Sequence, residues 1–115
     1  MTPHAKVAVA FASALVDGDF ERAHALLAPA LQQQFTPDAL RENFVDMFRG
    51  YARGNAKSVT LNEQFSFENW PAKLPGDLGW AYVGIIGDDF VEGVAVTVAD
   101  VEGCHLIRHI EWGRP

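Results

Sequence analysis

The sequence has little cysteine, few basic residues and no long hydrophobic run, and each shortage excludes a class of protein. One of its 115 residues is cysteine, so the chain can form no internal disulfide and its fold needs no oxidising compartment. No run of about 18 apolar residues predicts a membrane-spanning helix. Nine Lys and Arg stand against fifteen Asp and Glu, and the resulting net charge of -6 disfavours binding to nucleic-acid phosphates.

What the sequence does have is enough apolar material for one globular core. Hydrophobic residues make up 49% of the chain and charged residues 21%, and 115 residues suit a single domain. Lys6 precedes an apolar run over residues 7–16, a pattern that a short signal peptide shares. Because this run is rich in alanine and carries one apolar stripe, we interpret it as an amphipathic helix. We therefore expect a cytoplasmic protein without membrane or nucleic-acid partners.

Three helices are predicted in the first half of the chain. The first covers residues 3–16 and follows Thr2, whose hydroxyl suits an N-cap before a proline at the first helical position. The second covers about residues 20–28 and ends before Pro29, because proline disfavours the helical conformation of the residue before it. The third begins after Thr36, by the same combination of N-cap and proline.

The second half of the chain changes to the period of β-strands. Apolar residues from Val59 to Phe67 alternate with polar ones, and Glu63 interrupts the alternation, which indicates a bulge or a site. A loop rich in Pro and Gly is predicted over residues 70–79. Three further strands are predicted over residues 80–86, 91–101 and 104–112. The order predicts an α+β fold, with three N-terminal helices packed on a curved antiparallel four-stranded sheet.

Two motifs resemble those of a known superfamily. Residues 18–23 lead to Leu26 and Leu27, and Phe-Thr-Pro at residues 35–37 precedes the third helix. This order resembles nuclear transport factor 2-like proteins, which share a cystatin-like cone with ketosteroid isomerase and polyketide cyclase, and it spans nearly all of residues 1–115. The resemblance implies a pocket between the concave sheet face and the helices, and homodimers through the outer sheet face. The catalytic motifs of the enzyme members do not align with this sequence, so we expect a non-catalytic member.

The last predicted strand holds the most chemical information. Strict alternation divides it into one face of Cys104, Leu106, Arg108, Ile110 and Trp112 and an opposite face of His105, Ile107, His109 and Glu111. If the first face joins the core, Arg108 needs an acidic partner, for which Glu63 and Asp100 are candidates, or an anionic ligand. A third alternative is that its aliphatic stem lies on the core while its charged end reaches water.

The opposite face of the same strand leaves three alternatives open. His109 and Glu111 hold a metal only if a third ligand arrives from elsewhere, and a solvated polar surface needs none. His105 or His109 instead serves as a general base if it faces the pocket, because histidine titrates near neutral pH. We expect no metal, no cofactor, and a small buried side chain at Cys104.

The candidate ligand-binding residues are expected at the pocket floor, on the first helix and at the open end of the cone. They are Arg108, Trp112, Trp70, Phe11 and Tyr82. The expected function is non-catalytic binding of a small, mostly apolar ligand, with an anionic group near Arg108. One alternative is a protein-interaction module, such as a toxin-neutralising immunity-type protein with an acidic surface. Another is an isomerase, dehydratase or cyclase that uses His105, His109 or Asp100 as its base.

Overall fold

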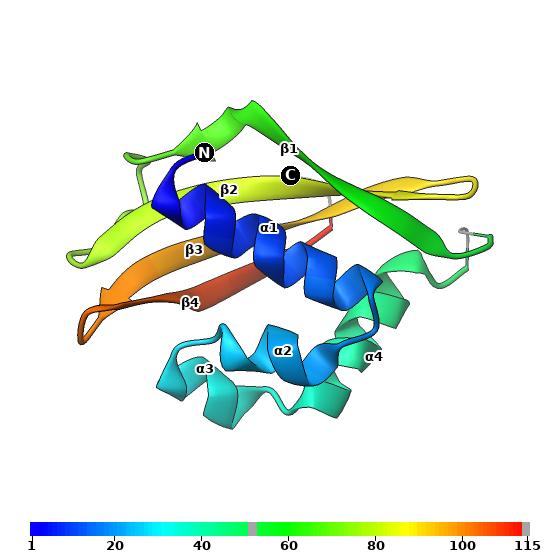
Figure 1. The fold of residues 1–115 in the computed structure, drawn as a ribbon, viewed down its shortest axis with the longest axis horizontal. Coiled ribbons are helices and arrows are strands. Elements are labelled where there is room, and N and C mark those ends of the chain that lie inside the picture. Colours follow the sequence, from blue (N-terminus) through cyan, green and yellow to red (C-terminus); the bar gives the residue numbers. More distant parts are fainter. Residues whose placement is uncertain (51–52, 114–115) are drawn as a thin grey trace.

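The computed structural model describes residues 1–50 and 53–113, which form four helices followed by a sheet of four antiparallel strands (Figure 1). The helices are α1 (Pro3–Val16), α2 (Phe20–Ala25), α3 (Pro29–Gln34) and α4 (Pro37–Phe48). The strands are β1 (Ala56–Phe67), β2 (Asp77–Gly87), β3 (Val91–Val101) and β4 (Cys104–Trp112), in the spatial order β1-β2-β3-β4. The predicted α+β class, with helices packed on an open antiparallel sheet, is confirmed.

The predicted helix starts are confirmed by their capping bonds. The Thr2 hydroxyl accepts from the Ala5 amide at 3.3 Å, and the Thr36 hydroxyl accepts from the Ala39 amide at 3.1 Å. The predicted end of the second helix is wrong. Pro29 begins a separate short helix, α3. Proline suits a first helical position because the amide hydrogen that it lacks would have no partner within the helix there.

The segment between α2 and α3 pairs with the sheet instead of continuing the helix. The Ala28 amide donates to the Ile107 carbonyl at 2.7 Å, and the Ile107 amide donates to the Leu26 carbonyl at 2.9 Å. Leu27 forms a parallel bridge with Ile107, and its side chain is buried. The apolar residues at 26 and 27 therefore belong to a turn that binds β4, although their spacing also suits a helix.

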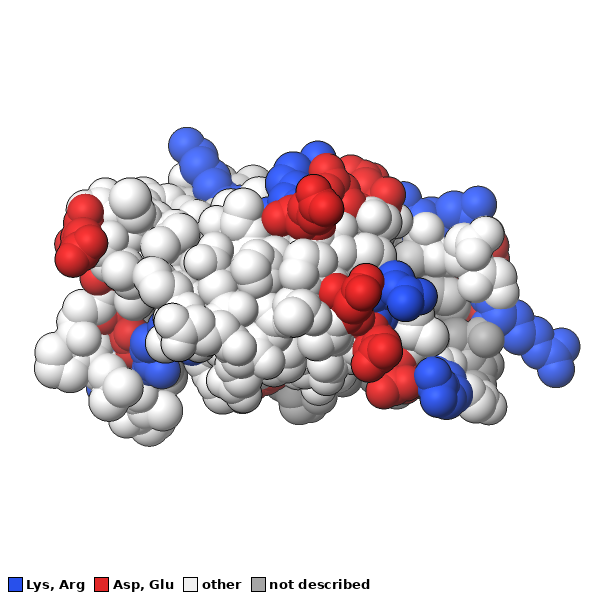
Figure 2. Space-filling view, turned by 90° about the horizontal axis from the view of Figure 1, so that it is seen from below, with Lys and Arg blue, Asp and Glu red and all other residues white. Residues whose placement is uncertain are grey.

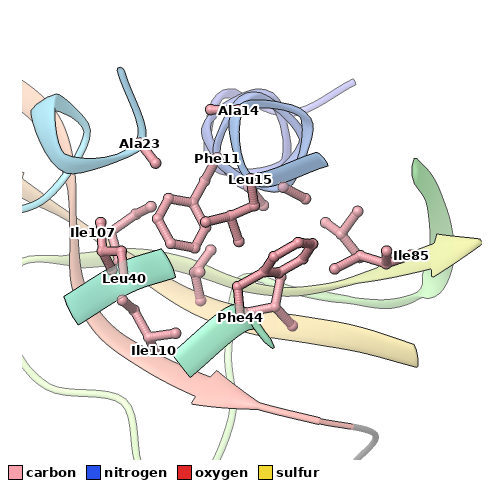
Figure 3. Packing of buried hydrophobic residues seen from close by; sticks show 14 of the residues in the cluster. Phe11, Ala14, Leu15, Ala23, Leu40, Phe44, Ile85, Ile107 and Ile110 are labelled. Atoms are coloured by element: carbon pink, nitrogen blue, oxygen red, sulfur yellow. The ribbon is translucent and has the colours of Figure 1, made fainter. Parts of the chain in front are cut away.

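The core lies between the helices and one face of the sheet, which we call the inner face. Figure 1 shows α1 lying across this face, and Figure 3 shows Phe11 and Leu15 of α1 beside Leu40 and Phe44 of α4. Val83 and other fully buried aliphatic side chains of the strands complete the cluster. The space under the middle of α1 is thus filled with apolar side chains.

The alternation of β1 breaks where Glu63 interrupts its apolar pattern. Leu61 pairs with Val83 and Ser66 with Ala81, so β1 uses more residues than β2 over the same length. The Gln64 amide donates to the Asn62 side chain at 2.9 Å, which forms a local turn outside the ladder. The predicted bulge is confirmed, and Figure 1 shows β1 bending away from β2 along its length.

The predicted faces of β4 are wrong because this strand also contains a bulge. Thr97 pairs with His109 and Val98 pairs with Ile107, so Arg108 is an extra residue in the ladder. Ile107 and Ile110 consequently both join the core, three residues apart instead of two. Arg108 and His109 lie on the opposite face of the sheet, which we call the outer face.

Candidate functional site

Arg108 forms a bidentate ion pair with Asp77 at the start of β2. Its Nε donates to Oδ1 and its Nη2 to Oδ2, both at 2.6 Å. The Asp77 side chain is 1% exposed and that of Arg108 is 30% exposed. The predicted partners Glu63 and Asp100 are therefore wrong, and the structural ion pair is the alternative that the geometry supports. The error arose because Asp77 follows Pro75 and Gly76, which predict a loop.

The ion pair shifts the pKa of both partners. The hydrogen bonds from Arg108 lower the pKa of Asp77 below its ordinary value of 3.8, although burial opposes this effect. The same bonds raise the pKa of Arg108. A further bond from the Leu74 amide to Asp77 Oδ2 at 2.8 Å also favours the carboxylate. Asp77 thus ties the loop before β2 to the bulge of β4.

Arg108 also borders a groove on the outer face, which we call the outer groove. Its volume is about 360 Å³. It is lined by Trp70, Ala72, Leu74, Trp80, Thr97, Arg108, His109 and Glu111. Trp80 Nε1 donates to Glu111 Oε2 at 2.6 Å, and Phe67 stacks on the Trp80 ring at a centroid distance of 5.6 Å. The structure therefore brings together two of the predicted ligand-binding residues, Trp70 and Arg108.

The other three predicted ligand-binding residues lie elsewhere. Phe11 is fully buried in the core, and Trp112 packs beside it with ring centroids 6.4 Å apart. Tyr82 lies on the outer face, in edge contact with Phe65. A Cβ at Gly93 would overlap the Tyr82 ring, so this glycine gives the tyrosine its place against β3. Phe11 and Trp112 thus lie in the core, Trp70 and Arg108 at the outer groove, and Tyr82 elsewhere on the outer face.

A larger cavity lies between the start of α1 and the bulge of β1, and we call it the His4 cavity. Its volume is about 450 Å³. It is lined by Thr2, His4, Ala5, Leu61, Glu63, Ser66, Phe67, Glu68 and Asn69. The bulge creates this space, because the part of β1 that leaves β2 forms one wall while the first turn of α1 forms the other.

His4 is the buried polar group of this cavity. It is 3% exposed, and its Nε2 is hydrogen-bonded to Ser66 Oγ at 2.9 Å. Burial lowers the pKa of His4 below its ordinary value of 6.5, and the carboxylate of Glu68 opposes this shift. The imidazole is therefore neutral at neutral pH. A Cβ at position 79 would overlap its ring, so Gly79 makes room for it.

His4 was not among the candidate residues, although it lies in the first turn of the helix predicted over residues 3–16. The available signal was the pair Thr2–Pro3, which fixes the helix from its first turn. His4 then lies on the same helical face as Ala8, Phe11 and Leu15, because residues four, seven and eleven apart share a face. A polar side chain on the buried face of a helix marks either a satisfied core residue or a site.

The residues considered for base or metal chemistry are dispersed. His105 and Cys104 are both exposed, so the predicted burial of Cys104 is wrong. Asp100 accepts from the Gly103 amide at 2.9 Å and closes the turn between β3 and β4. Within residues 1–50 and 53–113, no group of three or more His, Cys, Asp or Glu side chains could hold a metal ion.

Charges of both signs are interspersed on the side of the molecule where α2, α3 and α4 lie. Figure 2 shows this side from below, with carboxylates beside Lys or Arg side chains and a broad central area that carries neither. Arg22 pairs with Asp17 at 3.1 Å, and Arg49 pairs with Asp46 at 2.9 Å. The net negative charge therefore does not gather into one continuous acidic area in this view.

Comparison of the chain with models of protein families, with curated proteins and with solved structures finds no match. Membership of the nuclear transport factor 2-like superfamily stays a prediction that rests on the motifs and agrees with the fold class. No helix in the described part of the chain is long and apolar enough to cross a membrane. The His4 cavity and the outer groove are the features of the described structure whose geometry bears on function.

Proposed function

We propose that the protein is a non-catalytic binding domain that holds a small ligand in the His4 cavity. The observation that carries this proposal is a cavity of about 450 Å³ between a helix and the sheet. Pockets for small molecules are commonly about 300–1,000 Å³ and combine apolar walls with a few polar groups. This position agrees with the binding region that the superfamily resemblance implies.

The lining residues define the chemistry of the ligand. Ala5 and Leu61 offer apolar surface, whereas Glu63 and Glu68 offer carboxylates. None of the residues that line the cavity is Lys or Arg, and its two carboxylates outnumber the neighbouring ammonium of Lys73, which donates to the Glu68 backbone carbonyl at 2.8 Å. The ligand is a small molecule with an apolar body and a protonated amine. The expectation of an anionic group near Arg108 is not kept, because Arg108 lies on the outer face.

His4 and Ser66 would orient such a ligand. A neutral imidazole offers one donor and one acceptor nitrogen, and the hydroxyl of Ser66 satisfies Nε2. The ring is held between Ser66 and the backbone at Gly79, so it loses little freedom when a ligand binds. The exposed carboxylates of Glu63 and Glu68 would hold the amine, while Ala5 and Leu61 would contact the apolar body.

Isothermal titration calorimetry with benzylamine, benzyl alcohol and benzoate tests this proposal. We expect benzylamine to bind and the alcohol and carboxylate to bind at least about tenfold more weakly, because only the amine pairs with the carboxylates. The double variant Glu63→Gln/Glu68→Gln should lose the preference for the amine. The matched control Glu42→Gln, on the exposed side of α4, should keep it.

A second readout locates the bound amine. In NMR spectra, benzylamine should shift the His4 ring signals and leave those of exposed His105 unchanged. The proposal is wrong if neither benzylamine nor the longer amine hexylamine binds. It is also wrong if either amine binds but shifts His105 as strongly as His4.

We further propose that the protein forms a homodimer through the outer face. The support is a group of apolar side chains near the β2–β3 hairpin, the hairpin patch, which consists of Phe65, Tyr82, Ile86 and Val91. Phe65, Ile86 and Val91 are 40%, 38% and 58% exposed. Analytical ultracentrifugation should detect a dimer that Val91→Asp weakens. Val45→Asp on α4, where the side chain is also exposed, should leave it unchanged.

A further inference from the structure

We propose that the outer groove is a second binding site, and that its ligand is a neutral oligosaccharide. The groove lies on the face of the sheet opposite the helices, so it is separate from the His4 cavity. It combines two indole rings, Trp70 and Trp80, with the polar side chains of Thr97, Arg108 and His109. Flat aromatic surface beside several hydrogen-bonding groups suits a sugar ring, which has apolar C–H faces and polar edges.

The charge of Arg108 is compensated by Asp77, whereas the carboxylate of Glu111 keeps its negative charge, because the indole N–H that it accepts is neutral. Asp77 neutralises Arg108 through two hydrogen bonds, and Glu111 accepts the indole N–H of Trp80 at 2.6 Å. An anionic ligand would compete with Asp77 for Arg108, and a cationic ligand would meet the guanidinium at short range. A neutral ligand meets neither cost. The Asp77–Arg108 pair and the carboxylate of Glu111 therefore disfavour carboxylates and phosphates, whereas hydroxyl groups can bond to either side chain.

The same ion pair leaves hydrogen-bonding capacity for hydroxyl groups. Asp77 accepts from Nε and Nη2 of Arg108, so the Nη1 group can donate to a ligand. One carboxylate oxygen of Glu111 holds the indole, and the other can accept. Arg108 Nη1 and the second oxygen of Glu111 thus each offer a site to a ligand hydroxyl, and hydrogen bonds to charged groups are stronger than neutral ones.

The indole of Trp80 is held in place before any ligand binds. Phe67 stacks on it with an interplanar angle of 18°, and Glu111 fixes the edge that carries the N–H. A ring that is already ordered loses little conformational entropy on binding. Trp70 belongs to the loop before β2, and that loop is tied to the sheet by the bond between Leu74 and Asp77.

The bulge of β4 explains why this chemistry gathers on one face. Without the extra residue, Arg108 and His109 would point to opposite faces. The bulge places both beside Thr97 on the outer face, which adds donors to the groove. The groove lies toward the Asp77 end of β2, whereas Ile86 and Val91 of the hairpin patch lie at its other end. A dimer centred on Ile86 and Val91 would leave the groove accessible, whereas one that extends over Tyr82, two residues from Trp80, would reach the edge of the groove.

Tryptophan fluorescence and calorimetry with a panel of hexasaccharides test the proposal. The neutral probes are cellohexaose, chitohexaose, laminarihexaose, xylohexaose and maltohexaose, and the charged probes are hexagalacturonate and hexaglucosamine. We expect at least one neutral probe to bind and to alter the fluorescence of a Trp112→Phe protein, in which only Trp70 and Trp80 remain. Hexagalacturonate should bind at least about tenfold more weakly than that neutral probe, because it meets the Glu111 carboxylate and competes with Asp77 for Arg108, and hexaglucosamine should bind no better than the neutral probe.

Paired variants locate the site. Trp70→Ala should weaken binding about tenfold or more, whereas Phe65→Ala, which removes an exposed ring outside the groove, should not change it. His109→Ala should weaken binding about two- to tenfold, and His105→Ala on the same strand should not. Since His109 is exposed, its removal should leave the fold intact even if the Trp70 variant unfolds.

Three results would overturn the proposal. The first is that no neutral hexasaccharide binds at millimolar concentration. The second is that charged probes bind better than neutral ones. The third is that acrylamide fails to quench Trp70 and Trp80 in the Trp112→Phe protein, because the groove is then covered by another copy of the chain. None of these results bears on benzylamine binding in the His4 cavity.

Discussion

The two faces of the sheet come from the same strands but contain different classes of side chain. The inner face is aliphatic and closely packed against Phe11 and Phe44 of the helices. The outer face carries broad aromatic rings such as Trp80 and Tyr82, and the ring of Tyr82 lies over Gly93 of β3. Packing fills the inner face, whereas the outer face keeps flat, partly exposed surface. This difference places most of the stabilising burial on the inner face and leaves accessible aromatic surface on the outer face.

Two bulges change which face of the sheet carries polar side chains. In β1 the bulge opens a cavity on the helical side, beside His4, and in β4 it moves Arg108 to the outer side. The bulge of β1 thus adds polar groups where regular alternation would have continued an apolar face, and the bulge of β4 removes Arg108 from the apolar inner face. The four predictions below test this division, and they run from the largest expected effect to the smallest.

Phe11→Ala should cause the largest loss of stability, because Phe11 is fully buried in the middle of the core. We expect the free energy of unfolding to fall by about 3–5 kcal/mol, as is typical when a buried aromatic is removed. Urea unfolding followed by circular dichroism measures the loss. A loss below about 1 kcal/mol would show that the inner face is not the main source of stability.

Asp77→Asn should cause an intermediate loss, because it leaves the charge of Arg108 without its partner. We expect about 2–3 kcal/mol at pH 7, less than for a fully buried pair, since the Arg108 side chain is 30% exposed. The control Asp46→Asn breaks an exposed pair with Arg49 and should cost under about 1 kcal/mol. Equal losses in the two variants would show that the pair of Asp77 and Arg108 stabilises the fold no more than an exposed ion pair does.

The effect of Asp77→Asn should also depend on pH. The pKa of Asp77 is lowered on folding, so its contribution is complete above the ordinary value of 3.8 and is lost as the pH falls further. The difference in unfolding free energy between wild type and Asp77→Asn should therefore shrink between pH 5 and strongly acidic pH. A difference that stays constant would contradict the assigned cause of the pKa shift.

His4→Asn should change how stability depends on mildly acidic pH. Because burial lowers the pKa of His4 on folding, the unfolded chain takes up a proton below pH 6.5 that the folded chain does not. The wild type should lose stability as the pH falls from 7.5 to 5, and His4→Asn should lose less. His105→Asn, at an exposed position, should keep the wild-type slope. A wild-type slope in His4→Asn would mean that other groups cause it.

Phe65→Ser should have the smallest effect on the folded monomer. Phe65 is 40% exposed on the outer face, and its described ring contact is with Tyr82. We expect a loss within about 1 kcal/mol, measured at protein concentrations below those at which a dimer forms. A loss as large as that of Phe11→Ala would show that the outer face contributes to the core. The contrast between the two faces would then be wrong.

Much of the fold could be predicted because its signals are local. Capping residues such as Thr2 and Thr36 fix helix starts through hydrogen bonds within one turn. The strands at residues 91–101 and 104–112 have the predicted boundaries because turn residues flank them. The bulge at Glu63 was visible because a charged residue replaced an apolar one in the alternation.

The candidate site could be predicted only in part, because its contacts are not local. Arg108 was recognised as a residue that needs a partner, but the partner Asp77 is far away in the sequence. The sequence of β4 shows no sign of its bulge, because the spacing of Ile107, Arg108 and Ile110 is compatible with a regular strand as well as with a bulged one. The pairing of β4 with Thr97 and Val98 of β3 shows which arrangement occurs. The periodicity of a single sequence does not reveal this register.

The turn at Leu26–Ala28 has a consequence for aggregation. A sheet's outermost strands expose unpaired amides and carbonyls, to which strands of other molecules can add. At β4, the outward amide of Ile107 donates to Leu26 and its carbonyl accepts from Ala28, so another strand cannot pair with the sheet at this position. At the opposite border, β1 is interrupted by its own irregular stretch. Both edge strands are thus interrupted, which disfavours fibril growth by strand addition. Neither interruption depends on proline or clustered lysine.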